Sequence, residues 1–137
     1  MAVNDRETIF LESAPYLLVD DVFATAEYYR DVLGFSFENF FGDPPSFVIV
    51  RRNAARIMFR QVPQSVRPAP RPNSSRFAHT FDAYIWVSDV DRLAEEIRAR
   101  GAEIIDGPGD DDGRRLLLVR DLNGYHIAFG RVLSWPN

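Results

Sequence analysis

The sequence of 137 residues contains no cysteine, and this absence excludes several kinds of chemistry at once. Without thiols the chain forms no disulfide bonds, no thiolate zinc site and no cysteine nucleophile. Histidine is also scarce, with two residues in the whole chain. The sequence has no glycine-rich phosphate loop and no GxSxG nucleophile elbow either. Most common catalytic motifs are therefore missing.

Long hydrophobic runs and an excess of basic residues are missing as well. No run approaches the roughly 18 apolar residues of a membrane span, and the first ten residues, MAVNDRETIF, do not resemble a signal peptide. The net charge of −4 and the pI near 5.1 argue against a nucleic-acid partner, because phosphates bind to basic surfaces. We therefore expect a cytoplasmic protein with no membrane or nucleic-acid partner. The acidic charge is compatible with a cationic ligand.

The chain has ample material for a hydrophobic core. Hydrophobic residues make up 46% of it and aromatic residues 13%. At this length, such a composition predicts one compact domain over residues 1–137.

One stretch of the sequence occurs twice in similar form. Residues 16–30 are YLLVDDVFATAEYYR and residues 84–98 are YIWVSDVDRLAEEIR, with seven identical pairs among the fifteen. Each copy starts with alternating apolar residues and continues with apolar residues at helical spacing. Asp21 and Asp89 stand where helix N-caps are expected, and Gly34 and Gly101 stand just after the expected helix ends. Each copy therefore predicts a strand followed by a helix.

Three further strand-like segments follow each predicted helix. They are residues 35–40, 47–51 and 56–61 in the first half, and residues 102–105, 115–119 and 125–129 in the second. The acidic segment 106–113 is expected to be a solvated hairpin turn. The sequence thus predicts an α+β fold of two βαβββ modules, residues 11–62 and 78–132, joined by a proline-rich linker over residues 63–77.

Two motifs connect this pattern to a known family. Residues 18–22, LVDDV, lead into residues 28–35, YYRDVLGF, and the second half closes with VRDLNGYHIAF at residues 119–129. These motifs resemble the vicinal oxygen chelate superfamily of glyoxalases, extradiol dioxygenases and bleomycin-resistance proteins. The chain is closest in character to the metal-free members similar to bleomycin-resistance proteins. The resemblance implies strands curled around a central cavity, and it implies a homodimer.

Strand alternation then indicates which side chains face that cavity. The expected ligand-binding residues are Tyr16, Leu18, Arg56, Met58, Arg60, Asp82, Tyr84, Trp86 and His126. Several are aromatic, which favours a small aromatic or cationic ligand. The same rings would also suit a protein interface, so an interaction module is an alternative.

The metal ligands of the family are mostly lost. The resemblance places the four ligand positions at Ala14, Met58, Asp82 and Ala128, and only Asp82 has a donor side chain. We therefore expect a binding protein with no cofactor. An alternative is a metal-dependent lyase or dioxygenase that holds a divalent ion at a displaced site of Asp82 and His126, with Glu12 as a third ligand.

Catalysis without a metal is a further alternative, with Asp82 and His126 as the candidate catalytic residues. In that case His126 would act as a general acid or base. Asp82 is as readily explained as a structural carboxylate. The sequence leaves open whether the protein is an enzyme.

Overall fold

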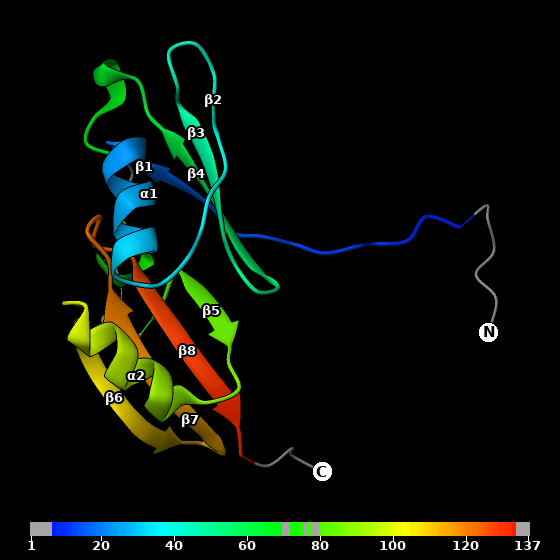
Figure 1. Cartoon of the computed structure of the whole chain (residues 1–137), viewed down its shortest axis with the longest axis vertical. Helices are drawn as coiled ribbons and strands as arrows, with labels where there is room; N and C mark the ends of the chain where they lie inside the picture. Colours follow the sequence, from blue (N-terminus) through cyan, green and yellow to red (C-terminus); the bar gives the residue numbers. More distant parts are fainter. Residues whose placement is uncertain (1–6, 70–71, 76, 78–79, 134–137) are drawn as a thin grey trace.

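The computed structural model describes residues 7–69, 72–75, 77 and 80–133, and these form two βαβββ modules (Figure 1). The first module contains β1 (Tyr16–Val19), α1 (Val22–Asp31), β2 (Phe40–Phe41), β3 (Phe47–Arg52) and β4 (Ala55–Gln61). The second contains β5 (Ala83–Trp86), α2 (Val90–Ala99), β6 (Glu103–Asp111), β7 (Arg114–Arg120) and β8 (His126–Val132).

Each module forms its own four-stranded mixed sheet. Sheet A has the strand order β1-β4-β3-β2, and sheet B repeats it as β5-β8-β7-β6. The first strand of each module runs parallel to the last one, while the other neighbours are antiparallel. The predicted α+β fold of two βαβββ repeats is confirmed, and the two sheets do not close into a barrel.

Both helices begin and end where the sequence predicts. The Asp21 carboxylate accepts a hydrogen bond from Ala24 N at 3.0 Å, and Asp89 does the same for Arg92 N. After the helices, Gly34 and Gly101 adopt positive φ angles of 75° and 91°, a conformation that glycine adopts without steric cost.

Each helix covers one face of its sheet and leaves the other face open. In β4, Ile57 and Phe59 are fully buried beneath α1, and they alternate with Arg56, Met58 and Arg60 on the opposite face. In β8, Ile127 and Phe129 face the core in the same way. In β4 the burial follows the alternation expected from the sequence, whereas in β8 every residue from His126 to Gly130 is buried.

The predicted strand at residues 35–40 is largely absent. Ser36 forms an isolated bridge to Arg51, and regular pairing begins only at β2. Between these points the rings of Phe37 and Phe40 pack together at 5.2 Å, and Phe40 also contacts Phe23 of α1 at 4.5 Å. Packing of these rings toward the helix replaces the expected β pairing.

The acidic segment 106–113 is not the long solvated turn that the sequence predicts. Strand β6 continues to Asp111, with register shifts at Ile104/Asp106 and at Asp106/Gly109. Only Asp112 and Gly113 form the turn into β7. Because β6 is an edge strand, it accommodates Pro108 at an irregular position where no ladder bond is needed.

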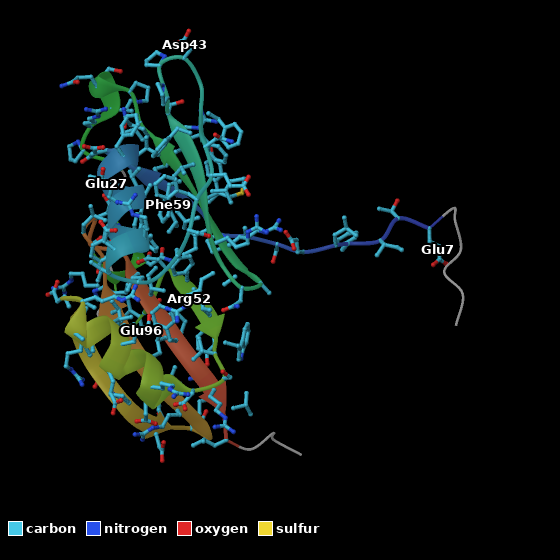
Figure 2. The ribbon with its side chains drawn as sticks, in the orientation of Figure 1. Glu7, Glu27, Asp43, Arg52, Phe59 and Glu96 are labelled. Atoms are coloured by element: carbon cyan, nitrogen blue, oxygen red, sulfur yellow. The ribbon has the colours of Figure 1, made fainter. Side chains whose placement is uncertain are left out.

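Buried side chains join the two modules. One hydrophobic cluster contains residues of both, and Tyr29 of α1 donates a hydrogen bond to Asp121 of the β7–β8 turn at 2.7 Å. Figure 2 labels a second connection, in which Arg52 of β3 binds both carboxylate oxygens of Glu96 in α2 at 2.8 and 2.9 Å. Neither helix in the described part of the chain has the length and apolarity needed to cross a membrane.

The linker predicted at residues 63–77 is described except for residues 70, 71 and 76. Its described residues include two short 3₁₀ turns, Gln64–Val66 and Asn73–Ser75. The Ala69 N–H donates to the Asp20 carboxylate at 2.8 Å, and the Asn73 N–H donates to Asp82. The linker is therefore held against both modules.

Candidate functional site

The face of sheet A opposite α1, here called the first open face, carries an aromatic cluster. Tyr16 stacks on Phe47 with ring centroids 5.9 Å apart, and the Phe41 and Phe47 centroids are also 5.9 Å apart. The guanidinium of Arg60 lies 5.2 Å from the Phe47 ring and donates to the Tyr16 hydroxyl at 2.9 Å. Tyr16 and Phe41 are half exposed, so these rings form a surface and not part of the core.

The corresponding face of sheet B, here called the second open face, carries a similar row. Phe81, Tyr84 and Trp86 follow one another with ring distances of 5.6 and 4.7 Å. Arg114 of β7 lies over the Tyr84 ring at 5.7 Å. Trp86 is 70% exposed, an unusual state for the largest apolar side chain. Each module thus presents three rings and one stacked arginine on the side away from its helix.

The position of the Tyr84 ring depends on a glycine in the next strand. A Cβ atom at Gly130 would lie 1.9 Å from the Tyr84 hydroxyl oxygen, so only glycine lets this ring lie across β8. The Tyr84 hydroxyl is buried and has no hydrogen-bond partner among the described residues. A buried hydroxyl without a partner is costly, and a ligand with a polar group is one way to satisfy it.

A pocket of about 630 Å³ lies on the second open face. Its apolar lining residues are Phe81, Ile105, Leu116, Leu117, Leu118 and Ala128. Asp106, Asp110 and Asp111 also line the pocket, with Arg114 as the basic residue. Arg115 pairs with Asp110, whereas Asp106 and Asp111 have no ion-pair partner in the described part of the chain. The pocket therefore combines apolar lining residues with two unpaired carboxylates and one guanidinium, that of Arg114.

Two other pockets lie elsewhere in the molecule. One of about 720 Å³ lies at the end of sheet A, between the β2–β3 turn and the linker, and includes Leu18 and Arg60. The other, of about 420 Å³, lies between the modules and is bordered by the β3–β4 turn, by Trp86 and by the start of α2. The Arg52–Glu96 ion pair lies at its wall, and the hydrogen bond from Arg52 lowers the pKa of Glu96.

Asp82 is occupied by backbone groups. Its two carboxylate oxygens accept hydrogen bonds from Asn73 N at 2.7 Å and from His126 N at 2.9 Å. Asp82 thus ties the linker to the start of β8, while Arg56 pairs with Glu12 and Arg60 donates to Tyr16. Its role toward a ligand stays a prediction.

His126 is 6% exposed at the start of β8. Arg120 Nε approaches its Nε2 atom at 3.4 Å, and its Nδ1 atom has no hydrogen-bond partner among the described residues. The structure brings the His126 backbone, not its imidazole, into contact with the Asp82 carboxylate. A general acid or base role for His126 therefore also stays a prediction.

The side chains at the metal positions of the family do not fit a metal ion. Ala14, Met58 and Ala128 offer no nitrogen or oxygen donor. Glu12, the expected third ligand of a displaced site, forms an ion pair with Arg56 instead. In the described residues no group of three or more His, Cys, Asp or Glu side chains is arranged to hold a metal.

The nine predicted ligand-binding residues are divided between the two modules. Tyr16, Leu18, Arg56, Met58 and Arg60 belong to sheet A, whereas Asp82, Tyr84, Trp86 and His126 lie in or beside sheet B. Tyr16 stacks within its own module, and so does Tyr84. Sequence reasoning missed Phe41, Phe47, Phe81 and Arg114. Alternation in β3 and β7 would have found Phe47 and Arg114 once their pairing with the neighbouring strands was known.

The comparisons with known proteins agree with this architecture. The sequence pattern of the Glyoxalase/Bleomycin resistance protein/Dioxygenase superfamily matches residues 11–129. Among curated proteins, no sequence matches the chain.

Several solved structures share the fold over almost the whole chain. TioX from Micromonospora sp. ML1 is 26% identical, with a TM-score of 0.65 over 93% of this chain and 100% of TioX. The bleomycin-binding protein from bleomycin-producing Streptomyces verticillus, solved with copper(II)-bleomycin, is 25% identical, with a TM-score of 0.65 over 94% of this chain and 100% of that one.

TnmS3, an antibiotic-binding protein from Streptomyces sp. CB03234, is 16% identical and resembles the chain in fold alone, with a TM-score of 0.66 over 91% of this chain and 99% of TnmS3. The family match covers both modules and agrees with the repeated βαβββ topology. The chain therefore belongs to the Glyoxalase/Bleomycin resistance protein/Dioxygenase superfamily.

Proposed function

We propose that the protein reversibly binds a small aromatic cation, without a metal, in the pocket of the second open face. The observation that carries this proposal is the combination, in one pocket, of apolar lining residues, three aspartates and the ring of Phe81. Phe81 begins the aromatic row that continues through Tyr84 to Trp86. The volume of about 630 Å³ lies in the range of small-molecule sites, roughly 300–1,000 Å³.

The chemistry of the pocket favours a ligand that is both flat and positively charged. Exposed aromatic rings offer stacking to a flat ligand and attract cations to their faces. Asp106 and Asp111 supply negative charge without a competing partner in the described residues. The net charge of −4 acts in the same direction over longer distances.

The relatives support the class of function, not the ligand. The bleomycin-binding protein is crystallised with copper(II)-bleomycin, and TnmS3 is described as antibiotic-binding. The first of these is 25% identical to this chain over nearly its full length. An antibiotic-like aromatic cation is therefore a reasonable first ligand class. Action as a homodimer in the cytoplasm, expected from the sequence, belongs to the same proposal.

The test is a binding screen by isothermal titration with three probes. These are metal-free bleomycin, ethidium as a planar aromatic cation, and anilinonaphthalene sulfonate as an aromatic anion. We expect at least one cationic probe to bind with micromolar affinity or better, and the anion to bind at least 10-fold more weakly. Binding of the anion alone, or of none of the three, would contradict the proposed site chemistry.

Variants locate the binding site. Phe81→Ala and Asp106→Asn should each weaken the cationic probe about 10-fold, because each removes a pocket contact worth roughly 1–2 kcal/mol. Leu122→Ala is the control, since Leu122 is an exposed apolar side chain in the β7–β8 turn outside the pocket. Equal loss in all three variants would indicate a general effect on folding.

A further inference from the structure

The hairpin of β6 and β7, at the outer edge of sheet B, brings charges of both signs to the second open face (Figure 1). Residues that pair across an antiparallel ladder point their side chains to the same face of the sheet. Asp106 is paired with Leu118, and Asp111 is paired with Arg114. Because Leu118 and Arg114 are four positions apart on β7, all four side chains lie on one face.

A bulge in β6 brings the two aspartates to this face. Asp106 and Asp111 are five positions apart, so in a regular strand their side chains would point to opposite faces. The register shift between Asp106 and Gly109 adds one residue to β6 and restores a common orientation. Gly107 lies in this bulge with a φ angle of 89°, and a Cβ atom there would collide with the Leu116 carbonyl oxygen. Glycine is therefore required at this point of the strand.

The guanidinium of Arg114 is not neutralised by the aspartate beside it. One position along the ladder, Asp110 and Arg115 form an ion pair at 3.0 Å. Arg114 and Asp111 are paired in the ladder too, but Arg114 forms no ion pair with any described residue and lies 5.7 Å from the centre of the Tyr84 ring. A guanidinium that stacks on a ring keeps the N–H groups in its own plane available to an oxyanion. The pocket therefore presents separate positive and negative groups to a ligand.

A ligand that is only a cation matches one part of this arrangement. The carboxylates of Asp106 and Asp111 attract its positive charge, whereas the guanidinium of Arg114 repels it. A carboxylate on the same ligand would replace this repulsion by two parallel hydrogen bonds from the guanidinium, and hydrogen bonds between charged groups are among the strongest that proteins form. A ligand with both charges would therefore satisfy the polar groups of the pocket better than a cation does.

We propose that the pocket selects an aromatic zwitterion, in which Arg114 binds a carboxylate of the ligand while Asp106 and Asp111 bind its cationic group. The inference rests on the proposed function, because it takes the pocket of the second open face as the site of the aromatic cation. It adds that Arg114 determines specificity, since this guanidinium distinguishes a ligand with a carboxylate from an otherwise similar cation. The ring of Tyr84 positions the guanidinium for that contact.

Two dyes that differ in one group provide the test. Rhodamine 110 has a cationic xanthene ring system and a free carboxylate, and rhodamine 123 is its methyl ester, a cation of nearly the same shape. Fluorescence anisotropy at neutral pH gives the dissociation constant of each dye with the wild-type protein. We expect the zwitterionic dye to bind at least about 10-fold more tightly than the ester dye, because only the free carboxylate accepts charge-assisted hydrogen bonds from Arg114.

A pair of variants assigns this preference to one residue. Arg114→Gln should reduce the preference for the zwitterionic dye to about 2-fold or less, because the neutral amide neither attracts the carboxylate nor repels the ester. Arg131→Gln is the matched control, since Arg131 is an exposed arginine of the neighbouring strand β8 and lies outside the pocket. This control should keep the preference within about 2-fold of the wild-type value. The circular dichroism spectrum verifies that both variants fold.

The outcomes separate this proposal from the function on which it rests. If the wild-type protein binds both dyes with equal affinity, or if folded Arg114→Gln protein keeps the full preference, the role of Arg114 is wrong and the binding of an aromatic cation stands. If neither dye binds, both proposals are wrong. The comparison of the two dyes on the wild-type protein needs no variant, so it remains decisive even if Arg114→Gln does not fold.

Discussion

Asp121, in the turn between β7 and β8, is 4% exposed and accepts three hydrogen bonds. Their donors are the Tyr29 hydroxyl at 2.7 Å, Asn123 N at 2.8 Å and Tyr125 N at 2.9 Å. Burial raises the pKa of Asp121 from 3.8 to about 6, although these hydrogen bonds act in the opposite direction. The stability of the junction between the modules therefore depends on pH through this one carboxyl group.

The sign of this linkage gives a prediction for stability. Because the folded-state pKa is raised, the native protein binds the proton more tightly than the unfolded chain does. The contribution of Asp121 is therefore fully present below about pH 4 and is lost as the pH rises through about 6, a change of about 3 kcal/mol at most. Asp121→Asn keeps the geometry but does not titrate, so it should remove this change.

The measurement is the free energy of unfolding in urea from pH 4 to 7 for wild type and variant. The wild-type value minus the variant value should fall across that range. A constant difference would show that the Asp121 carboxyl does not titrate there.

Asp82 gives a second prediction at this scale, because its oxygens bind two backbone N–H groups from distant segments. Asp82→Ala leaves both donors without their partner and should destabilise the protein by about 1–3 kcal/mol in urea unfolding. Asp82→Asn, which retains an acceptor oxygen, should cost less. A variant that loses ligand affinity at unchanged stability would instead support a direct role in binding.

The predictable elements were those whose signal is local. The caps Asp21 and Asp89 and the stripe of buried residues in each helix depend on neighbours within four positions, so the sequence predicts α1 and α2 correctly. Strands β2 and β6 depend on distant partners. The rings of Phe37 and Phe40 pack toward α1, and β6 is extended by its pairing with β7. Neither effect can be predicted from the sequence of the segment alone.

Strand β8 provides a prediction about how one element shapes another. Gly130→Ala would place a methyl group against the Tyr84 ring, which must move off β8. We expect a loss of about 1–3 kcal/mol in stability and a change in the near-ultraviolet circular dichroism of the aromatic row. Gly109→Ala in β6 is the matched control, because a Cβ there meets nothing within 4 Å. Equal effects of the two substitutions would argue against the ring position described.

At the level of the whole molecule, Arg52 and Glu96 connect the modules in a way that the sequence does not reveal. Arg52 also donates to Leu33 O at 2.9 Å, and both side chains are about one-third exposed. Arg52→Gln should therefore cost about 1 kcal/mol, with a smaller loss in 1 M salt. Arg30→Gln, which breaks an exposed pair within α1, should cost less in the same urea titrations. Equal losses in the free energy of unfolding for the two variants would show that the Arg52–Glu96 pair does not stabilise the contact between the modules.

The site was only partly predictable for the same reason as the strands. Alternation within β1, β4 and β5 correctly assigned Tyr16, Met58 and Tyr84 to the faces away from the helices. The sequence does not show that these residues separate onto two open faces, because that depends on how the modules pack. Nor does it show that the Asp82 carboxylate binds the backbone of His126, since the contact spans 44 positions.

The central claim is that the second open face binds an aromatic cation without a metal. Its most direct measurement is isothermal titration of metal-stripped protein with ethidium, first in EDTA and then with one equivalent of zinc. We predict saturable binding in EDTA that zinc leaves unchanged and that Phe81→Ala, in the pocket lining, weakens about 10-fold. Binding that appears only with zinc, or binding that Phe81→Ala does not affect, would contradict the account.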